Sequence, residues 1–489
     1  MSEQIFLHEY RNIVDDMFVG FKPNGSSVKP VHIAGGSLRS IYGVIADTKK
    51  IKRLSYVANA AGKIPNGNEI GAVYAFLAET ERIDEEIGEN ELESMRNVMQ
   101  KLLAADKGVY SGTTDGMVSY TAGSKYFITK KAMYEDAGEF IGGVIKQYCP
   151  ELACYIKKNL DSANDPITLL FSPVLEDEPE LTFENSIHED IPAFKIMNTT
   201  MEWYLNGIKS GGQCLLENLK SHPNHLSQLR LFNIFCVFHL MRYLAMLEAF
   251  YCEETVRPIL LDFTKNSGNS ISRASQMSYT QMHRAISRFY AWAYAQHLGT
   301  LSKKELMELE TPVYDAKKTS KTGKEELDHM WGLAKEEAVY CNSDDDLRLI
   351  FGTTIYDMLA LEASSHPVNY LKAIGTQVGI LYPPDNLHPN KRFVLSQDVV
   401  EMLLRCCVTP REVLNGTELR RRLWERFGVV VGGSAFELDK LQSNGSILQV
   451  DEDSLENNFS AFASMLESMD FAEIMADGIL QIRLGGVDN

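Results

Sequence analysis

The feature that most constrains the fold lies near the C-terminus, where a run of helix signals ends in a short hairpin pattern. Residues 471–475 and 479–484 are apolar-alternating segments that flank the dipeptide Asp477-Gly478. Asp-Gly suits a type I′ turn, in which both central residues have positive φ. The sequence therefore predicts a two-stranded hairpin with Asp477-Gly478 at its tip.

Four predicted helices precede this hairpin, and each begins at a residue that can cap it. A capping side-chain oxygen accepts hydrogen bonds from the free N–H groups of the first helical turn. The candidate caps are Ser396, Asn415, Ser434 and Asp453. Between the second and third helices, residues 429–431 predict a short strand. Helices followed by a hairpin are typical of a winged-helix module, which we expect at residues 393–489.

A chain of 489 residues is too long for one compact core, so several domains are expected. Residues 1–175 mix helix and strand patterns and include a second hairpin pattern at 117–129, whereas residues 190–380 show helical periodicity. An acidic tract at 175–190 and a proline-bearing linker at 383–389 mark the expected junctions. The predicted fold is mainly α and multidomain, with a mixed α/β N-terminal domain, a helical middle domain and a C-terminal winged-helix-like module.

Bulk properties restrict the class of protein. The formal net charge of -18 repels nucleic-acid phosphates at long range, so DNA contact requires a local basic patch or a partner. The 8 cysteines are scattered, which indicates reduced thiols rather than a disulfide framework. No secretory signal is visible at residues 1–10, and the longest apolar run, 231–250, contains His239, Arg242 and Glu248. We therefore expect a cytoplasmic protein with a buried core helix and no membrane span.

The charge of the last helix distinguishes two uses of the C-terminal module. In a winged helix that reads DNA, the helix before the wing normally lies in the major groove and carries cations. Here that helix carries Glu456 near its start and Glu467 near its end, and Asp477 lies at the hairpin tip. An acidic surface favours docking to a protein, so we predict these three residues as partner-binding.

Direct nucleic-acid binding is the alternative use. The residues predicted for it are Arg273, Arg284, Arg288, Arg420 and Arg426. The first three accompany aromatic residues in the helical segment 275–298 or just before it, a combination that suits single-stranded nucleic acid. The last two belong to an arginine cluster on the helix expected at 417–427. The structural alternative for 275–298 is a core helix whose arginines are solvated or paired internally.

A buried strand pattern at residues 257–265 ends in a carboxylate and a lysine. Many metal-dependent nucleases place such groups at a strand end with one residue between them, whereas Asp262 and Lys265 are separated by two. A metal site also requires a second acid, which the sequence does not place. A nuclease centred on Asp262 and Lys265 is the enzymatic alternative, and a strand followed by a polar turn is the structural one.

One group of residues resembles a set of metal ligands. Its members are Cys214, His222, Cys236 and His239. The Cys-x-x-His step is usable geometry on a helix, but the compact paired spacing of structural zinc sites is missing. Residues 29–39 predict a strand, a glycine-rich turn and a helix start. The glycine segments at 35–37 and 432–434 each precede a helix start and could hold an anion at its N-terminus, but neither matches a nucleotide-binding motif. We therefore predict no metal and no other cofactor.

Residues 258–262, 270–279 and 423–429 give the chain a resemblance to uncharacterised accessory proteins of bacterial genome-defence clusters. The resemblance covers the latter half and implies work beside an ATPase, helicase or nuclease partner in anti-phage or anti-plasmid defence. The chain is also similar to kleisin subunits of bacterial condensin-like complexes, which have winged helices at both ends of an acidic middle. The resulting expectation is a non-catalytic assembly or adaptor subunit of a DNA-directed complex.

Overall fold

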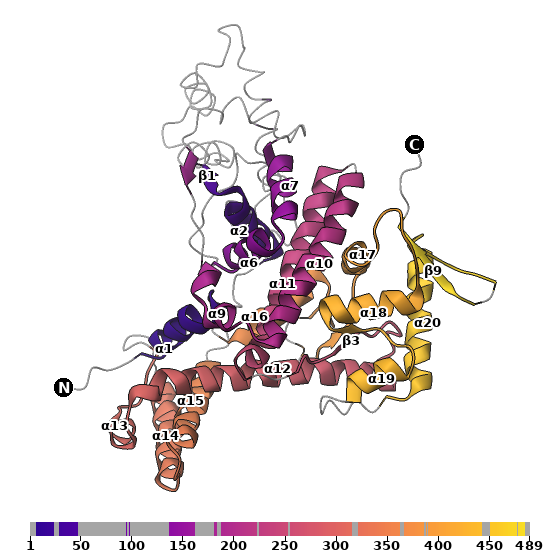
Figure 1. The fold of residues 1–489 in the computed structure, drawn as a ribbon. Helices are drawn as coiled ribbons and strands as arrows, with labels where there is room; N and C mark the ends of the chain where they lie inside the picture. Colours follow the sequence, from indigo (N-terminus) through magenta and orange to yellow (C-terminus); the bar gives the residue numbers. More distant parts are fainter. Residues whose placement is uncertain are drawn as a thin grey trace, which may run out of the picture.

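The computed structural model shows a mostly helical protein, which confirms the predicted mainly α class (Figure 1). Its strands are short, and those of the described residues lie in four small sheets. The described residues are 94, 97, 388 and the ranges 6–23, 29–46, 136–161, 180–182, 187–222, 224–252, 255–314, 321–361, 366–385, 390–442, 450–476 and 478–484.

The described helices fall into three groups along the chain. The N-terminal helices are α1 (Leu7–Val14), η1 (Asp15–Val19), α2 (Pro30–Tyr42), α6 (Ala137–Tyr148) and α7 (Pro150–Asp161). The central helices are η5 (Ile187–Asp190), α9 (Pro192–Ile196), α10 (Thr199–Ser221), α11 (His225–Cys252), α12 (Ser270–His297), η6 (Leu298–Thr300), α13 (Lys303–Glu308), α14 (Lys321–Val339), α15 (Asp344–Ala360) and α16 (Pro367–Val378). The C-terminal helices are α17 (Gln397–Arg405), α18 (Gly416–Phe427), α19 (Ala435–Gln442) and α20 (Glu452–Ser468).

The strands of the described residues are β1 (Val44–Ala46), β2 (Glu180–Thr182), β3 (Ile259–Leu260), β4 (Leu381–Tyr382), β5 (Arg392–Phe393), β6 (Val413–Asn415), β7 (Val429–Val430), β8 (Ala472–Ile474) and β9 (Leu480–Arg483). The β1–β2, β4–β5, β6–β9 and β9–β8 pairs are antiparallel, and the β3–β7 pair is parallel.

Helix α11 is the central helix of the core. By length and composition alone it could cross a membrane, but 94% of its apolar window is buried inside the protein. Its side chains pack against α12, α2, α16 and α17, and the Tyr243 ring contacts the rings of Phe140 and Tyr204. The apolar run is therefore a buried core helix, as its three charged or titratable residues predicted.

One hydrophobic core connects the described residues from Leu7 to Leu484. Helix α12 runs along it and contacts both α15 and α20, which lie toward its two ends (Figure 1). The division into residues 1–175, 190–380 and 393–489 stays a prediction. The shared core shows that the three parts contact one another, whereas folding of each part alone is a separate property.

The strand and glycine turn expected around residues 30–37 are wrong, because this segment lies within one helix, α2. Its glycines allow a close approach to α6 instead of making a turn. A Cβ atom on Gly36 would lie 2.7 Å from the Cα of Gly138. Beside this contact, Arg39 Nη2 and Glu139 Oε1 form a buried ion pair at 2.5 Å. The predicted anion-binding role of the loop at 35–37 is therefore also wrong.

Several other predictions concern loops and linkers. The hairpin expected at 117–129 lies outside the described residues. The polar, basic segment 317–324 predicts a loop from its sequence, but residues 321–324 begin α14 instead. The linker at 383–389 connects β4 to β5, and Lys391 donates to the carbonyl oxygens of Pro383 and Asp385, the latter at 2.7 Å. The start of this segment is therefore held against Lys391, the residue before β5.

In the C-terminal region, two of the four predicted caps are confirmed, whereas the Ser434 N–H and hydroxyl both donate to Glu437 Oε2 at 3.0 Å. Ser396 accepts from the backbone N–H of Val399, and Asn415 accepts from that of Glu418 at 2.8 Å. The cap of α20 is Asp451 rather than the predicted Asp453. The described elements occur in the order α17, β6, α18, β7, α19, α20, β8, β9, and the sheet order is β6-β9-β8. The predicted hairpin is thus confirmed, and β6 adds a third strand that the sequence did not indicate.

The turn of this hairpin differs from the predicted type. Gly478 donates its N–H to the Met475 carbonyl at 2.8 Å, and Met475 donates to the Ile479 carbonyl at 3.0 Å. These bonds enclose three residues rather than the two of a type I′ turn. Gly478 has φ 79°, as expected for the left-handed position that closes a three-residue hairpin loop. Asp477 itself lies outside the described residues.

A parallel strand pair joins the central and C-terminal parts of the chain. Strand β3 pairs with β7 in the register Ile259↔Val429. The buried side chain of Asn458 in α20 stabilises this junction. It accepts from the Phe263 N–H at 2.8 Å and donates to the carbonyls of Leu261, at 2.7 Å, and Val431. The last helix is therefore anchored to the strand that precedes α12.

Candidate docking surface of the C-terminal module

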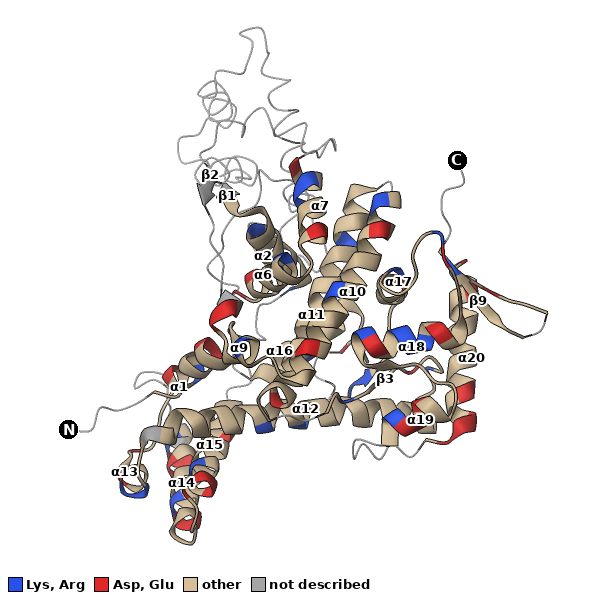
Figure 2. Ribbon diagram, viewed as in Figure 1, with Lys and Arg blue, Asp and Glu red and all other residues tan. Residues whose placement is uncertain are grey.

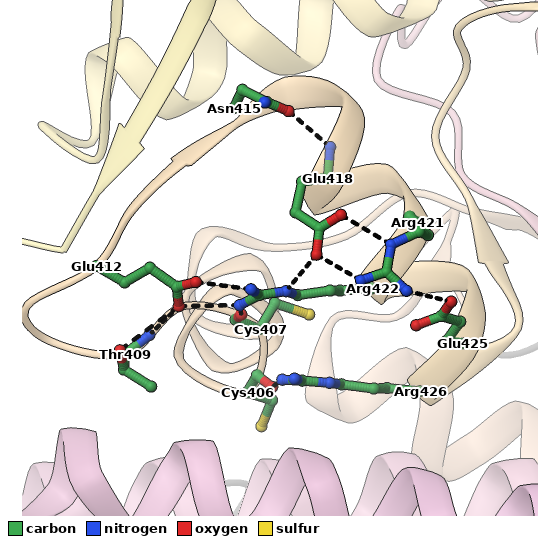
Figure 3. Close-up of polar contacts among 10 residues, drawn as sticks. All are labelled: Cys406, Cys407, Thr409, Glu412, Asn415, Glu418, Arg421, Arg422, Glu425 and Arg426. Carbon is green, nitrogen blue, oxygen red and sulfur yellow. Dashed lines mark hydrogen bonds and ion pairs between the residues drawn. The ribbon is translucent and has the colours of Figure 1, made fainter.

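The arginine cluster on α18 is engaged in contacts within the protein (Figure 3). Arg422 binds both oxygens of Glu412, at 2.6 and 2.9 Å, and its Nη1 also donates to the Cys407 carbonyl at 2.6 Å. Arg421 contacts Glu418 at 2.5 and 2.7 Å. Hydrogen bonds from Arg421 and then Arg422 lower the pKa of Glu418 to about 2. Carboxylates three, four and ten residues away thus balance these cations.

The two α18 residues predicted to contact nucleic acid also have internal partners. Arg420 donates to the Gly432 carbonyl at 3.3 Å, lies 3.3 Å from Glu437, and covers the Phe459 ring. Its side chain is 11% exposed. Arg426 donates to the Cys406 carbonyl (Figure 3). Both guanidinium groups therefore connect α18 to neighbouring loops, and their use on phosphates would require breaking these contacts.

Helix α20 presents an acidic face at its N-terminal end (Figure 2). Glu452, Asp453 and Glu456 are exposed there, so Glu456 lies on the surface as its predicted role requires. Glu467 is half-buried, and its Oε1 accepts from the Ile474 N–H at 3.3 Å. Glu467 therefore also has a local structural role at the start of the hairpin.

The β6-β9-β8 sheet presents apolar side chains on its outer face and at its tip. Val413 is 56% exposed, Ile479 49% and Met475 38%. A groove of about 370 Å³ lies on this face and is lined by Val413, Asp470, Phe471, Ala472, Glu473, Gln481 and Arg483. Sequence reasoning missed these apolar residues. The sequence does contain a signal for them. Apolar residues occur on both faces of the predicted hairpin, although a hairpin needs only one apolar face to pack against a core.

The arginines of α12 are placed differently from those of α18. Arg273 and Arg284 are exposed, and neither forms an ion pair with another residue in the described part of the chain. Arg288 binds both oxygens of Glu248, at 2.5 and 2.9 Å, and Arg257 binds the same carboxylate at 2.7 Å. Of the three predicted nucleic-acid residues on this helix, two therefore have a side chain available to an external ligand.

Asp262 lies in a buried hydrogen-bond network after β3. The Asp262 carboxylate is fully buried and accepts from the hydroxyls of Thr264 at 2.7 Å and Ser272 at 2.6 Å. Arg392 lies 3.2 Å from it, and the Lys265 N–H also donates to it. Among the residues that the structure describes, no group of three His, Cys, Asp or Glu side chains could hold a metal ion. The geometry is that of a structural carboxylate after a strand.

The four residues predicted as alternative metal ligands are not brought together. Cys236 is fully buried near Ser37 of α2, whereas the His239 ring lies among aromatic rings that include Phe235 at 4.5 Å and Phe427 at 5.5 Å. Burial, with a smaller contribution from Arg242, lowers the pKa of His239 to about 3. All 8 cysteines are free thiols. Cys214, Cys236 and His239 are therefore separate core side chains, and His222 is half-buried at the C-terminal end of α10.

Comparisons with protein families, with curated proteins and with solved structures give no match for this chain.

Proposed function

We propose that this protein is a non-catalytic assembly or adaptor subunit that docks a partner protein through a C-terminal winged-helix-like module. The order α17, β6, α18, α20, β8, β9 supports the winged-helix interpretation. The sheet order β6-β9-β8 supports it further, because the strand after the first helix pairs with the second strand of the hairpin. In this interpretation, β7 and α19 are an insertion between the second and third helices of the module.

The observation that carries the proposal is the composition of the wing. Residues 469–484 contain one basic residue, Arg483, whereas Val413, Met475 and Ile479 expose apolar side chains on the same sheet. A wing that grips DNA needs cations for the phosphates, which dominate affinity. Exposed apolar side chains beside a groove are typical of protein-binding surfaces instead.

The proposal extends to the cellular context through the resemblance of the sequence to accessory proteins of genome-defence clusters. In that context the partner is an ATPase, helicase or nuclease subunit in the cytoplasm, and contact with DNA is indirect. The net charge of -18 supports indirect contact, because it repels DNA over most of the surface. The engaged carboxylate of Asp262 supports a role without catalysis.

Affinity purification of the full-length chain from its native cells tests the proposal. The variant Val413→Lys with Ile479→Lys places two charges on the wing surface and is expected to lose the partner. The matched control is Leu333→Lys with Leu349→Lys, at side chains that are 51% and 44% exposed on α14 and α15. The control is expected to retain the partner. Equal retention by both variants, or no stoichiometric partner with the unmodified chain, would contradict the proposal.

A second candidate function is direct nucleic-acid binding by α12, and the exposed guanidinium groups of Arg273 and Arg284 favour it. Titration of labelled duplex and single-stranded DNA at two salt concentrations tests it. Under the docking proposal, the unmodified chain binds DNA weakly. Charge reversal of both arginines should leave this weak binding unchanged, and so should the control variant Arg411→Glu. Tight binding by the unmodified chain, with a salt slope that falls by about one unit per reversed arginine, would favour this candidate.

A further inference from the structure

Strand β8 lies at the edge of the β6-β9-β8 sheet, so one side of its backbone faces no other strand of the described residues. Phe471 and Met475 form the hydrogen bonds to β9, through the Phe471 carbonyl at 2.9 Å and the Met475 N–H at 3.0 Å. In an antiparallel pair, residues that bond to the partner strand alternate with residues that direct their N–H and C=O groups to the other side, so Phe471, Glu473 and Met475 face β9. The backbone groups of Ala472 and Ile474 therefore point away from β9.

One of these outward groups has a removable cap. The Ile474 N–H donates to the Glu467 carboxylate at 3.3 Å. Glu467 is on α20, and its side chain can rotate away without breaking the β8–β9 hydrogen bonds. Proteins often protect a free sheet edge with a charged side chain, because an open edge pairs readily with other strands. The capped edge is therefore protected against pairing while retaining the backbone groups that pairing needs.

We propose that an extended, basic segment of the partner protein adds to β8 as a fourth strand; this inference rests on the proposed docking function and specifies how docking occurs. The surroundings of the edge are acidic, with Glu467, Asp470 and Glu473 within seven residues. Ile474 and Met475 are 48% and 38% exposed beside it. A strand that alternates basic and aliphatic side chains complements both features. Strand addition obtains affinity from main-chain hydrogen bonds and specificity from alternate side chains.

The same charges select against a second copy of this chain as the occupant. Antiparallel pairing of β8 with its own copy would bring Glu473 of one chain close to the acidic residues of the other. Like charges on neighbouring strands destabilise pairing. The edge is therefore suited to a basic strand rather than to self-association.

The test uses the full-length chain and a labelled eight-residue peptide that alternates lysine and valine. Ala472→Pro removes an outward N–H while leaving the β9 hydrogen bonds intact, since proline is accepted on edge strands. We expect this variant to bind the peptide at least about fivefold more weakly, consistent with the loss of one backbone hydrogen bond and obstruction by the ring. A peptide that alternates glutamate and valine is expected not to bind.

A second pair of variants tests for stronger rather than weaker peptide binding. This test does not depend on the proline variant folding normally. Glu467→Gln loses the charge but keeps an oxygen that can cap the Ile474 N–H, whereas Glu467→Ala removes both. We expect the alanine variant to bind the lysine peptide about threefold more tightly than the glutamine variant, since the edge is uncovered. Equal binding by these two variants would overturn the proposal.

The outcomes separate this inference from the proposed function. If the partner is lost in Val413→Lys with Ile479→Lys but the unmodified chain does not bind the peptide, docking stands and strand addition is overturned. If the partner is retained by that double variant, the docking function itself fails. Concentration-dependent dimerisation that Ala472→Pro abolishes would assign the edge to a second copy and overturn the basic partner strand.

Discussion

The α2–α6 helix pair and the C-terminal module are stabilised in contrasting ways. The helix pair depends on glycines that let two backbones touch, with a buried ion pair beside them. The C-terminal module depends on capped helix ends and on partly exposed networks such as that of Arg422, whose side chain is 18% exposed. The ion pair of α2 and α6 joins residues 100 positions apart, whereas the contacts of Arg422 join residues within 15 positions. This difference determines how each region responds to mutation. It also determines how well the structure of each region can be predicted from its sequence.

The ion pair of Arg39 and Glu139 should give the largest effect. Both side chains are almost fully buried, with exposures of 5% and 3%. Removal of one partner from a buried pair typically destabilises a protein by about 3 to 5 kcal/mol. We expect Glu139→Ala to lower the free energy of unfolding by about 3 kcal/mol or more, measured by chemical denaturation.

Its counterpart in the C-terminal module is the exposed pair of Arg421 and Glu425, whose side chains are each 50% exposed. We expect Glu425→Ala to change the same free energy by less than about 1 kcal/mol, since solvent screens the pair. Equal losses in Glu139→Ala and Glu425→Ala would show that burial does not distinguish the two regions.

The glycine contact should give the second largest effect. A Cβ atom on Gly138 would lie 2.6 Å from the Ile33 carbonyl oxygen and 2.8 Å from the Gly36 Cα. These are backbone atoms of a helix and cannot rotate away, so the helices must separate. We expect Gly138→Ala to lower the free energy of unfolding by about 1 to 3 kcal/mol, the usual range for overpacking.

Gly35→Ala is the matched control on the same helix pair. Its Cβ atom would meet only the end of the Arg39 side chain, at an ordinary distance of 3.6 Å. Alanine favours a helix over glycine by up to about 1 kcal/mol, so this change is expected to be neutral or stabilising. Destabilisation by Gly35→Ala equal to that by Gly138→Ala would contradict the close-packing explanation.

The contrast explains which parts of the fold the sequence predicted. The caps at Ser396 and Asn415 were correct because a cap and the N–H that it binds lie three residues apart. Glycine permits turns, so the sequence predicts a turn at 35–37, whereas the actual role of these glycines depends on their contact with α6. Strand β6 and the β3–β7 pair were missed for the same reason, since neither is stable without a distant partner strand.

The candidate site shows the same limit. The exposure of Glu456 follows from helical periodicity and was predictable. The internal pairing of Arg420 depends on Gly432 and Glu437, which lie on a later loop and helix. A count of arginines therefore could not distinguish the engaged cluster on α18 from the exposed Arg273 and Arg284 on α12. The distinction required the positions of the carboxylates and carbonyls around each side chain.

The smallest effect is expected from a cap in the C-terminal module. Asn415 Oδ1 accepts from the Glu418 N–H at 2.8 Å at the start of α18. Loss of such a cap typically costs about 1 kcal/mol. We expect Asn415→Ala to lower the free energy of unfolding by that amount, with Asn457→Ala at an exposed position of α20 as the control. Because α18 carries the Glu412–Arg422 contact, the loss should appear first as faster amide exchange in α18. If exchange in α18 is unchanged while α2 and α6 become less protected, the two regions are not stabilised separately and the comparison fails.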